Sequence, residues 1–545
     1  MSSPTAALAS TSTPRLARVR VAASWRIPRA VARATSGPAS SRRHAWFAPS
    51  RAPRRAAQIA TAAVSGMGGV FDQLRAKAAA AMNKAVAPSA SGSLVDITFA
   101  DVAPSWDALA ARVAERKAEL GMPLDVDLEN GPTNPHALIR RFGTTEEPRV
   151  LFYRDHAAWC PYCQKIWMQL EEKRIPYRVE KINMRCYGDK KKSFTDKVPS
   201  GMLPVVEIDG VLMTESAAIA AALEEKFPDN NPLLPPAGTP ERRRADDLCR
   251  LERALFGRWM GWLTQGWMDG QNRSNFEEAL DAVDAELAAS PGPYFMGEEL
   301  TLVDVTYAPF LERMAASLCY YKGFKMEGNG GRWPAVDAWY AAMASREDTY
   351  ARIKSDYYTH CHDLPPQLGG CEANGDDAQA AARDEIDGGG WRLPLPPLGA
   401  DALEPSWRGE RPEMDRVEAA AKLVGNHDAV TRFAARGCGE AGARPVAAPL
   451  SDPTATPGEA HLPAVDAALR RVAHELLDGT AHEDGVGGDA GTGAKDAART
   501  LAAGPAADSL AYLRDRVGVP RDLPLPAARQ LRAHLNWFID RLAEA

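Results

Sequence analysis

The sequence predicts an α/β domain followed by an all-helical domain, with a further, mainly helical region at the C-terminal end. Three observations support this fold class. Strand-like and helix-like apolar patterns alternate over residues 147–228. Residues 241–355 lack this alternation and show helical apolar spacing throughout. The helical spacing returns over residues 401–545, after a segment in which Asp, Gly and Pro dominate.

The first residues of the chain have the composition of a targeting segment. Residues 1–71 contain eleven Arg and no Asp, Glu or Lys, among many Ala, Ser and Pro. An Arg-rich, acid-poor segment of this kind is typical of an organelle transit peptide, and we predict one over residues 1–66. The Ser, Ala and Pro content favours the chloroplast, with the mitochondrion as the alternative.

The charge of the remaining chain argues against a nucleic-acid-binding protein. Without residues 1–71, the chain has 54 basic and 71 acidic residues, a net charge of −17. A basic surface that could follow a phosphate backbone is therefore not expected. The sequence also contains no run of about 18 apolar residues, and it predicts no membrane span.

A helical extension is predicted over residues 67–146, ahead of the main fold. It contains two helices, over residues 69–84 and 105–120. The second begins after Ser105, a residue type that is favoured at the N-cap. Its apolar residues then recur at helical spacing, as Trp106, Leu109 and Val113.

The α/β domain, predicted over residues 147–228, has its elements in the order βαβ and then ββα. In chain order these are strand 149–154, helix 161–174, strand 177–182, a basic loop, strand 205–208, strand 211–213 and helix 216–226. Asp209-Gly210 lies between two short apolar runs, which is a strong signal for a tight hairpin. This order is the thioredoxin arrangement.

The all-helical domain is predicted over residues 241–363, after a linker rich in Pro and Asn. Thr301 and Asp304 form a capping pair, because each side chain can accept a hydrogen bond from the other residue's backbone N–H. We expect the helix that they start to run from Val303 to about Tyr320.

A second linker is predicted over residues 364–400, where Asp, Gly and Pro become frequent. The C-terminal extension, residues 401–545, has helical segments at 411–435, 463–478, 508–517 and 525–543. An insert between them, residues 479–495, is rich in Gly and Asp and is predicted to be disordered.

The most informative feature of the chain is a pair of cysteines at a predicted strand-to-helix junction. Cys160-Pro161-Tyr162-Cys163 opens helix 161–174. A helix N-terminus stabilises a thiolate, which is the reactive form of the side chain. The second thiol is close enough to attack a mixed disulfide that forms on the first. We therefore predict a redox-active dithiol site with Cys160 and Cys163 as the catalytic residues.

Two other interpretations of the pair stay open. It could bind a metal ion or a glutathione-ligated iron–sulfur cluster, but a zinc site needs two further ligands. The other local cluster of ligand-type side chains, His360-Cys361-His362, lies some two hundred residues away, and we predict no metal site. The two thiols could also be inert core residues. Eight cysteines with one close pair predict no disulfide framework and a reducing compartment.

Further motifs follow in the order that a known family uses. Leu203-Pro204 precedes strand 205–208, and Glu215-Ser216 opens helix 216–226. With the cysteine-bearing helix and the Thr–Asp cap, residues 147–360 resemble a glutathione transferase. The resemblance implies that Leu203 and Pro204, in a cis-proline turn, hold the cysteinyl part of glutathione. It also implies that Glu215 and Ser216 hold the γ-glutamyl carboxylate at a helix N-terminus.

The resemblance extends to the basic loop. The stretch from Lys190 to Gly201 is similar to the glutathione-contacting loop of Omega-class members. This similarity implies that Lys190 binds glutathione, and neighbouring lysines compete for the role: Lys191, Lys192 and Lys197. Tyr162 is expected to lie at the glutathione site and to shape access to the sulfur of Cys160.

The cysteine at position 160 indicates the class. Many glutathione transferases have Ser or Tyr there and conjugate glutathione, whereas a cysteine forms a mixed disulfide with it. With Cys163, a transit-type leader and a long C-terminal extension, the chain resembles the Iota class of photosynthetic organisms. The function of the extension is not implied by the class.

We therefore expect a glutathione-dependent thiol–disulfide oxidoreductase, a thioltransferase, with glutathione as cosubstrate and a homodimer as the assembly. Small disulfides and glutathionylated proteins are the expected substrates, and dehydroascorbate reduction is a related reaction. The alternatives are a non-enzymatic glutathione or hydrophobic-ligand binding protein, and a scaffold acting through the C-terminal tail. An acceptor pocket is expected between the domains, and the candidate lining residues are aromatic: Trp259, Trp262, Trp267, Tyr320 and Tyr321. Because these residues recur at helical spacing, at least half of them are expected to belong to the core instead.

Overall fold

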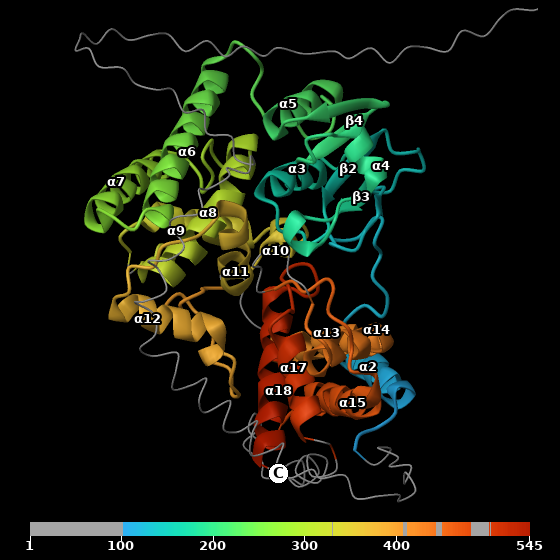
Figure 1. Ribbon diagram of the computed structural model, residues 1–545. Coiled ribbons are helices and arrows are strands. Elements are labelled where there is room, and N and C mark those ends of the chain that lie inside the picture. Colours follow the sequence, from blue (N-terminus) through green and yellow to red (C-terminus); the bar gives the residue numbers. More distant parts are fainter. Residues whose placement is uncertain are drawn as a thin grey trace, which may run out of the picture. The chain divides into compact units, whose positions relative to one another are not determined.

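The computed structural model describes residues 102–329, 331–406, 411–442, 450–480, 501 and 503–544 (Figure 1). Thr98–Ala545 form one compact unit. The predicted transit peptide, the predicted helix over residues 69–84 and most of the predicted disordered insert lie outside the described residues.

A five-stranded sheet forms the centre of the α/β domain. Its strands are β1 (Ile139–Arg140), β2 (Val150–Asp155), β3 (Tyr177–Ile182), β4 (Val205–Ile208) and β5 (Val211–Thr214). Their order across the sheet is β1-β3-β2-β4-β5, with β2 parallel to β3 and the other neighbours antiparallel. The predicted βαβ and ββα order is confirmed. Strand β1 was not predicted, because two residues are too short to show a period.

Helices cover both faces of the sheet. The longer helices α3 (Pro161–Glu172) and α5 (Ser216–Lys226) share a core with Phe152 and Val206 on one face (Figure 1). The basic loop contains a short helix, α4 (Lys192–Lys197), which the sequence analysis missed. It forms because Phe194 anchors it in a small core on the opposite face, with Tyr153, Ile182, Val198 and Val205.

The second domain is all-helical, as predicted. It consists of α6 (Pro240–Thr264), α7 (Asp269–Ala288), α8 (Leu302–Lys322), α9 (Pro334–Ala344), α10 (Tyr350–Ile353) and α11 (Tyr357–Leu368). The capping box of α8 is present, and Asp304 accepts from the backbone N–H of Thr301 at 2.9 Å. Most residues of α8 are buried, because α3, α6 and α11 all pack against it.

The segment predicted as a second linker contains ordered helix. Residues 364–368 complete α11, and α12 (Asp377–Asp384) continues into a π-helical turn, Glu385–Gly389. Asp376 caps α12 by accepting from Gln379 N at 2.7 Å. The Gly-rich composition hid this helix, although the capping aspartate was a usable signal.

The C-terminal extension is a helical bundle built from α13 (Pro412–Gly425), α14 (His427–Ala434), α15 (Leu462–Asp478), α17 (Ala503–Arg514) and α18 (Leu525–Glu544), with short 3-10 turns Ala435–Cys438 and Glu459–His461. The helix predicted over residues 411–435 is two helices. The chain leaves the α-helical conformation at Asn426, directly after Gly425, because both residue types end helices readily.

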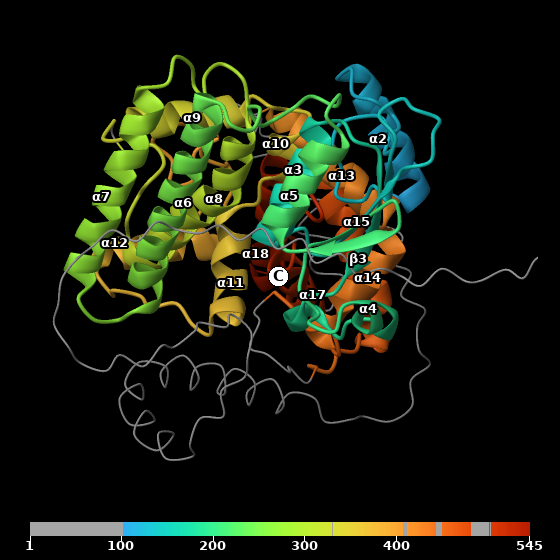
Figure 2. The ribbon, with the colours of Figure 1, turned by 90° about the horizontal axis from the view of Figure 1, so that it is seen from above.

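Helix α2, the described helix of the predicted N-terminal extension, packs with the C-terminal extension. Helix α2 (Trp106–Glu119) begins after Ser105, as predicted, and buries Leu109 and Val113 in the core of the C-terminal bundle. Trp106 Nε1 donates to Asp466 Oδ1 at 2.7 Å. Both views place α2 beside α13 and α15 (Figures 1 and 2). Among the described helices, none has a stretch long and apolar enough to cross a membrane.

Candidate active site

The cysteine pair lies where β2 passes into α3. Strand β2 ends at Asp155, Cys160 is the N-cap residue of α3, and Pro161 takes the first helical position, which suits its fixed φ. No side chain caps this helix end. Cys160 is half-buried, whereas Cys163 is 2% exposed. The positive end of the α3 dipole therefore acts on the more accessible thiol.

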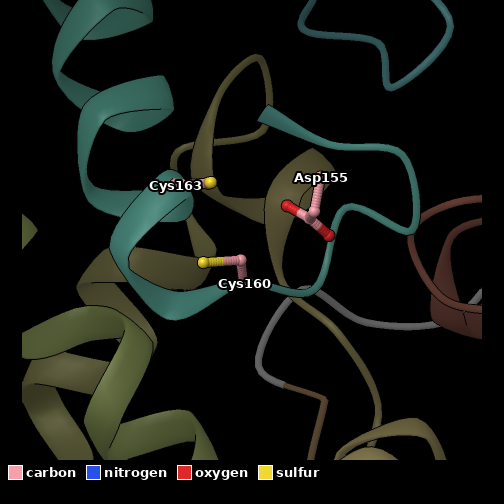
Figure 3. A group of neighbouring side chains, drawn as sticks. All are labelled: Asp155, Cys160 and Cys163. Carbon is pink, nitrogen blue, oxygen red and sulfur yellow. The ribbon is translucent and has the colours of Figure 1, made fainter. Parts of the chain in front are cut away.

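A buried carboxylate completes the site. The sulfurs of Cys160 and Cys163 and a carboxylate oxygen of Asp155 lie within 4.8 Å of one another, and Figure 3 shows the three side chains gathered at the junction. Asp155 is 1% exposed, and its Oδ2 accepts from the backbone N–H of Trp159 at 2.6 Å. Burial raises the pKa of the Cys163 thiol well above its usual range, and Cys160 and Asp155 raise it further. Cys163 is therefore held protonated.

Asp155 was not among the predicted site residues. An acidic residue directly after the predicted strand 149–154, five residues before the first cysteine, was the available signal. The described residues supply three ligand-type side chains here, one fewer than the four of a structural zinc site. The alternative cluster is occupied otherwise: His360 Nε2 lies 3.3 Å from Glu312 Oε2, and His362 Nε2 lies 2.8 Å from Asp387 Oδ1.

The sheet register brings the other predicted motifs to the end of the sheet where β2 leads into the cysteine pair. Tyr153 of β2 pairs with Val205 of β4, and Val205 pairs with Thr214 of β5. Leu203-Pro204 directly precedes Val205, and the peptide bond between them is cis, as predicted. The turn therefore lies at the end of the sheet where β2 stops and the cysteine loop, residues 156–160, begins.

Glu215 and Ser216 follow Thr214 at the same end of the sheet. Glu215 has a φ of +69°, which turns the chain from β5 into α5, and its exposed side chain makes no capping hydrogen bond. Ser216, half-buried, is the first residue of α5. The N–H groups of the first turn of α5 thus have no side-chain cap and are suited to a carboxylate.

The structure separates Lys190 from the lysines that competed with it. Lys190 Nζ donates to the backbone O of Asn183 at 2.6 Å, and burial lowers its pKa, while the charges of Cys163 and Cys160 oppose that shift. Its ammonium group is therefore within electrostatic reach of both thiols. Two of the competing lysines form ion pairs with other residues, Lys192 with Asp196 and Lys197 with Glu207.

Tyr162 lies at the boundary between the two domains. Its ring meets Phe310 of α8 edge-on, with centroids 5.7 Å apart, and burial raises its pKa. Tyr162 thus connects the first turn of α3 with the helical domain, next to Cys160.

The aromatic residues predicted to line an acceptor pocket have structural roles. Trp259 and Trp262 are almost fully buried in the helical core, where they donate to Ser317 Oγ and Asp269 Oδ1, both at 2.9 Å. Tyr320 is also buried, and Tyr321 Oη donates to a backbone carbonyl. Trp267 is 63% exposed. The helical spacing of Trp259, Trp262 and Tyr320 thus reflects core packing and not a pocket. A pocket lined by Trp267 and Tyr321 stays a prediction.

Two family models match this part of the chain. Residues 159–226 match the N-terminal domain of glutathione S-transferases, and residues 252–342 match their C-terminal domain. The first match contains the cysteine pair, and the second contains α8.

The chain is also similar to several plant proteins. It is 32% identical over 168 residues to glutathione S-transferase DHAR2 of Arabidopsis thaliana, a match that covers 31% of this chain and 72% of that protein. It is 29% identical over 189 residues to the chloroplastic glutathione S-transferase DHAR3 of the same plant, covering 34% of this chain and 66% of that protein.

Solved structures of the family are similar as well. Glutathione transferase Omega 3C from Trametes versicolor shares 25% identity, covers 41% of this chain with 92% of its own, and has a TM-score of 0.36. Dehydroascorbate reductase from Chlamydomonas reinhardtii shares 23% identity, covers 39% of this chain with 94% of its own, and has a TM-score of 0.31.

The two matched domains, in this order and on this fold, together with a relative at 32% identity, assign the family. The chain belongs to the glutathione S-transferase family, whose members use glutathione as a cosubstrate.

Proposed function

We propose that the protein is a glutathione-dependent thiol–disulfide oxidoreductase in which Cys160 is the nucleophile. The observation that carries this proposal is the contrast between the two thiols. Cys160 is half-buried at the N-terminus of α3, whereas Cys163 is buried and protonated within 4.8 Å of it. A thiolate at a helix N-terminus with a resolving thiol beside it suits disulfide exchange.

The reaction begins on the glutathionyl sulfur of a glutathionylated protein or of a small disulfide. The Cys160 thiolate attacks that sulfur, a Cys160–glutathione disulfide forms, and the released thiolate takes up a proton. Free glutathione, as its thiolate, can then attack the glutathionyl sulfur, which forms oxidised glutathione and releases the Cys160 thiolate. Alternatively, Cys163 attacks the sulfur of Cys160. In the second case Asp155 accepts the proton of Cys163, the Cys160–Cys163 disulfide forms, and glutathione leaves as a thiolate that is protonated by solvent.

Glutathione would bind at the end of the sheet beside the cysteine loop. The cis turn at Leu203-Pro204 presents backbone groups to the cysteinyl part, and Ser216 with the uncapped N-terminus of α5 accepts the γ-glutamyl carboxylate. Glu215 would bind the γ-glutamyl ammonium, and Lys190 would bind a glutathione carboxylate by its positive charge.

The proposal extends to the class of the enzyme, a related reaction and the location of the protein. The two cysteines and the C-terminal bundle favour the Iota class, and the same Cys160 attack on a carbonyl carbon would begin dehydroascorbate reduction. A chloroplast location is supported by the Arg-rich leader and by a relative named as chloroplastic. A homodimer stays a prediction. The buried Trp259 and Trp262 speak against a hydrophobic-ligand carrier.

Turnover of hydroxyethyl disulfide with glutathione tests the proposal. The wild-type protein should reduce the disulfide, and Cys160→Ser should lose this activity, since a hydroxyl is far less readily ionised than a thiol and is a poor nucleophile at neutral pH. Cys438→Ser is the matched control, because Cys438 is also half-buried but lies in the C-terminal bundle. Full activity of Cys160→Ser would refute the assignment of the nucleophile.

A further inference from the structure

A fully buried arginine of the helical domain contacts the cysteine loop. Arg313 is in the middle of α8 and is 1% exposed. Moving a guanidinium out of water is unfavourable unless an opposite charge and hydrogen bonds compensate. The contacts of Arg313 therefore indicate what the charge does there.

These contacts hold both ends of the cysteine motif. Nη2 of Arg313 donates to the carbonyl oxygen of Trp159, the residue before Cys160. Nη1 donates to Gln164 Oε1 at 3.0 Å, and Gln164 directly follows Cys163. The guanidinium also lies over the indole of Trp159, 4.8 Å from the ring centroid. One side chain thus fixes the backbone before the first thiol and the side chain after the second.

Glu312 supplies the opposite charge. Gln164 Nε2 donates to Glu312 Oε1 at 2.8 Å, which orients the amide so that its oxygen faces Arg313. The other oxygen of Glu312 lies 3.3 Å from His360 Nε2. Burial and then the charge of Arg313 lower the pKa of His360 to about 4, so this imidazole is neutral and Glu312 is the countercharge of Arg313.

The two charges are not equivalent with respect to the thiol. Arg313 interacts favourably with the negative charges of Cys160 and Asp155. Glu312 instead interacts first with His360 and then with Arg313 and Lys354, all of them groups of the helical domain. The cation is therefore the member of the pair that acts on the thiolate.

We propose that Arg313 is a positioning residue for thiol transfer, which holds the cysteine loop at the N-terminus of α3 and stabilises the Cys160 thiolate from the helical domain. This inference rests on the proposed function, because it takes Cys160 as the nucleophile. It makes the reactivity of Cys160 depend on the docking of the helical domain onto the α/β domain.

The pH dependence of Cys160 alkylation tests this role. Iodoacetamide is reacted with the full chain carrying Cys163→Ser, and modification of the Cys160 peptide is followed by mass spectrometry. The other charged or titratable groups around Cys160 among the described residues are Asp155, Tyr162 and Lys190, and every variant keeps them.

Arg313→Met should lower the alkylation rate at pH 7 about tenfold, by raising the pH of half-maximal reaction by about one unit. Arg313→Lys keeps the charge but loses the planar fork, and its half-maximal pH should stay nearer that of the parent protein. If Arg313→Met does not fold, the same comparison is made with Glu312→Gln/Arg313→Met, which removes both buried charges together.

Arg140→Met is the matched control. Arg140 is equally buried, binds Glu171 through two hydrogen bonds of 2.9 Å and lies over Phe142, but it does not contact the cysteine loop. It should leave the half-maximal pH unchanged. An unchanged half-maximal pH in Arg313→Met, or an equal shift in Arg140→Met, would overturn the role of Arg313 but not the proposed function. A parent Cys160 that reacts only above about pH 9, as an ordinary thiol does, would overturn the proposed function as well.

Discussion

At the scale of single residues, the environment of each thiol determines its task. Cys160 and Cys163 are three positions apart on one helix, so their sulfurs lie on the same side of its first turn. Burial keeps Cys163 protonated and leaves Cys160 accessible at the helix end. In the proposed reaction Cys163 resolves the mixed disulfide, and a protonated thiol in that role needs a group that removes its proton. Asp155, buried within 4.8 Å of both sulfurs, is placed for that step.

Cys163→Ala should trap the first intermediate. After exposure to oxidised glutathione, the variant is expected to carry a glutathione adduct on Cys160, because no second thiol is left to displace it. The wild-type protein should instead show an internal disulfide between residues 160 and 163. Mass spectrometry of the two proteins distinguishes these products. Accumulation of the adduct in the wild-type protein would mean that Cys163 only tunes Cys160 and that the enzyme is a monothiol transferase.

Asp155→Asn should slow the formation of the internal disulfide. The amide has the shape of the carboxylate but cannot accept the Cys163 proton, and general-base catalysis is worth about 10²-fold or more. The rate, measured by acid quench and mass spectrometry from the preformed glutathione adduct, should fall by about that factor at pH 7 and approach the wild-type rate at high pH. Cys160 alkylation in the same variant checks that the loop is intact. Equal rates at pH 7 would exclude Asp155 as the proton acceptor.

Much of this site could be predicted from the sequence, because its order along the chain carries the information. The cysteine pair, the cis proline and the Glu215-Ser216 turn each lie next to a strand or helix boundary that local patterns identify. Asp155 and Arg313 were missed for a different reason. Each acts through contacts across the fold, and a single acidic or basic residue in an apolar segment does not reveal which distant groups it will meet.

At the scale of elements, the main finding is that α2 and the C-terminal helices share one core. A helical extension was predicted before the α/β domain and another after the helical domain, and the described residues have helices in both. The apolar face of a helix does not indicate which other helix will pack against it. Helix α2 is separated from α15 by more than 300 residues. The short elements β1, α4 and α12 were missed because tertiary contacts, and not a local period, stabilise them.

A buried ion pair joins the C-terminal bundle to the helical domain. Arg532 of α18 donates to Asp356 Oδ2 at 2.5 Å, and both side chains are 1% exposed. Asp356 also caps α11, by accepting from Thr359 N at 3.0 Å. The guanidinium of Arg532 lies 4.7 Å from the ring centroid of Trp391. The bundle therefore contributes directly to the N-terminus of α11.

Arg532→Met should destabilise the whole chain, because it leaves the Asp356 carboxylate buried without its partner. The free energy of unfolding, measured in urea, should fall by about 3–5 kcal/mol. The double variant Asp356→Asn/Arg532→Met should recover part of that loss. Arg149→Met is the control, since its pair with Asp209 is 52% and 45% exposed and is worth at most about 1 kcal/mol. Similar losses in the two single variants would contradict the structural role of the buried pair.

At the scale of the whole molecule, the C-terminal bundle is part of the folded unit and not an appended tail. Besides the ion pair, Ser355 Oγ donates to the carbonyl oxygen of Val519, and Tyr358 Oη donates to that of Asp515. Deleting residues 401–545 would therefore remove partners of buried groups in the helical domain and uncover the apolar face of α2. Point variants are the sharper test of a scaffold function, because they leave this packing in place.

One buried cluster connects all three parts of the molecule near the site. Tyr187, from the loop after β3, donates to both carboxylate oxygens of Asp363 on α11 at 3.0 Å. Arg521 of the C-terminal region lies over the Tyr187 ring, 6.0 Å from its centroid. Burial raises the pKa of Asp363 from 3.8 to about 7, while Tyr187 and Arg521 oppose the rise. Below about pH 7 the folded protein therefore keeps a proton on Asp363 that the unfolded chain has released.

The sign of the resulting pH dependence follows from this proton. Between about pH 4 and 7 the folded state binds one proton more at Asp363 than the unfolded state, so Asp363 makes the protein less stable as the pH rises through that window. Asp363→Asn mimics the protonated carboxyl and has no such dependence. Its stability relative to the wild-type protein should therefore increase from pH 5 to pH 8, by about 2–4 kcal/mol. Other titrating groups are common to both proteins and cancel in the difference. Urea unfolding of both proteins at pH 5, 6, 7 and 8 measures it, and a difference that does not change with pH would show that Asp363 is ionised in the folded state.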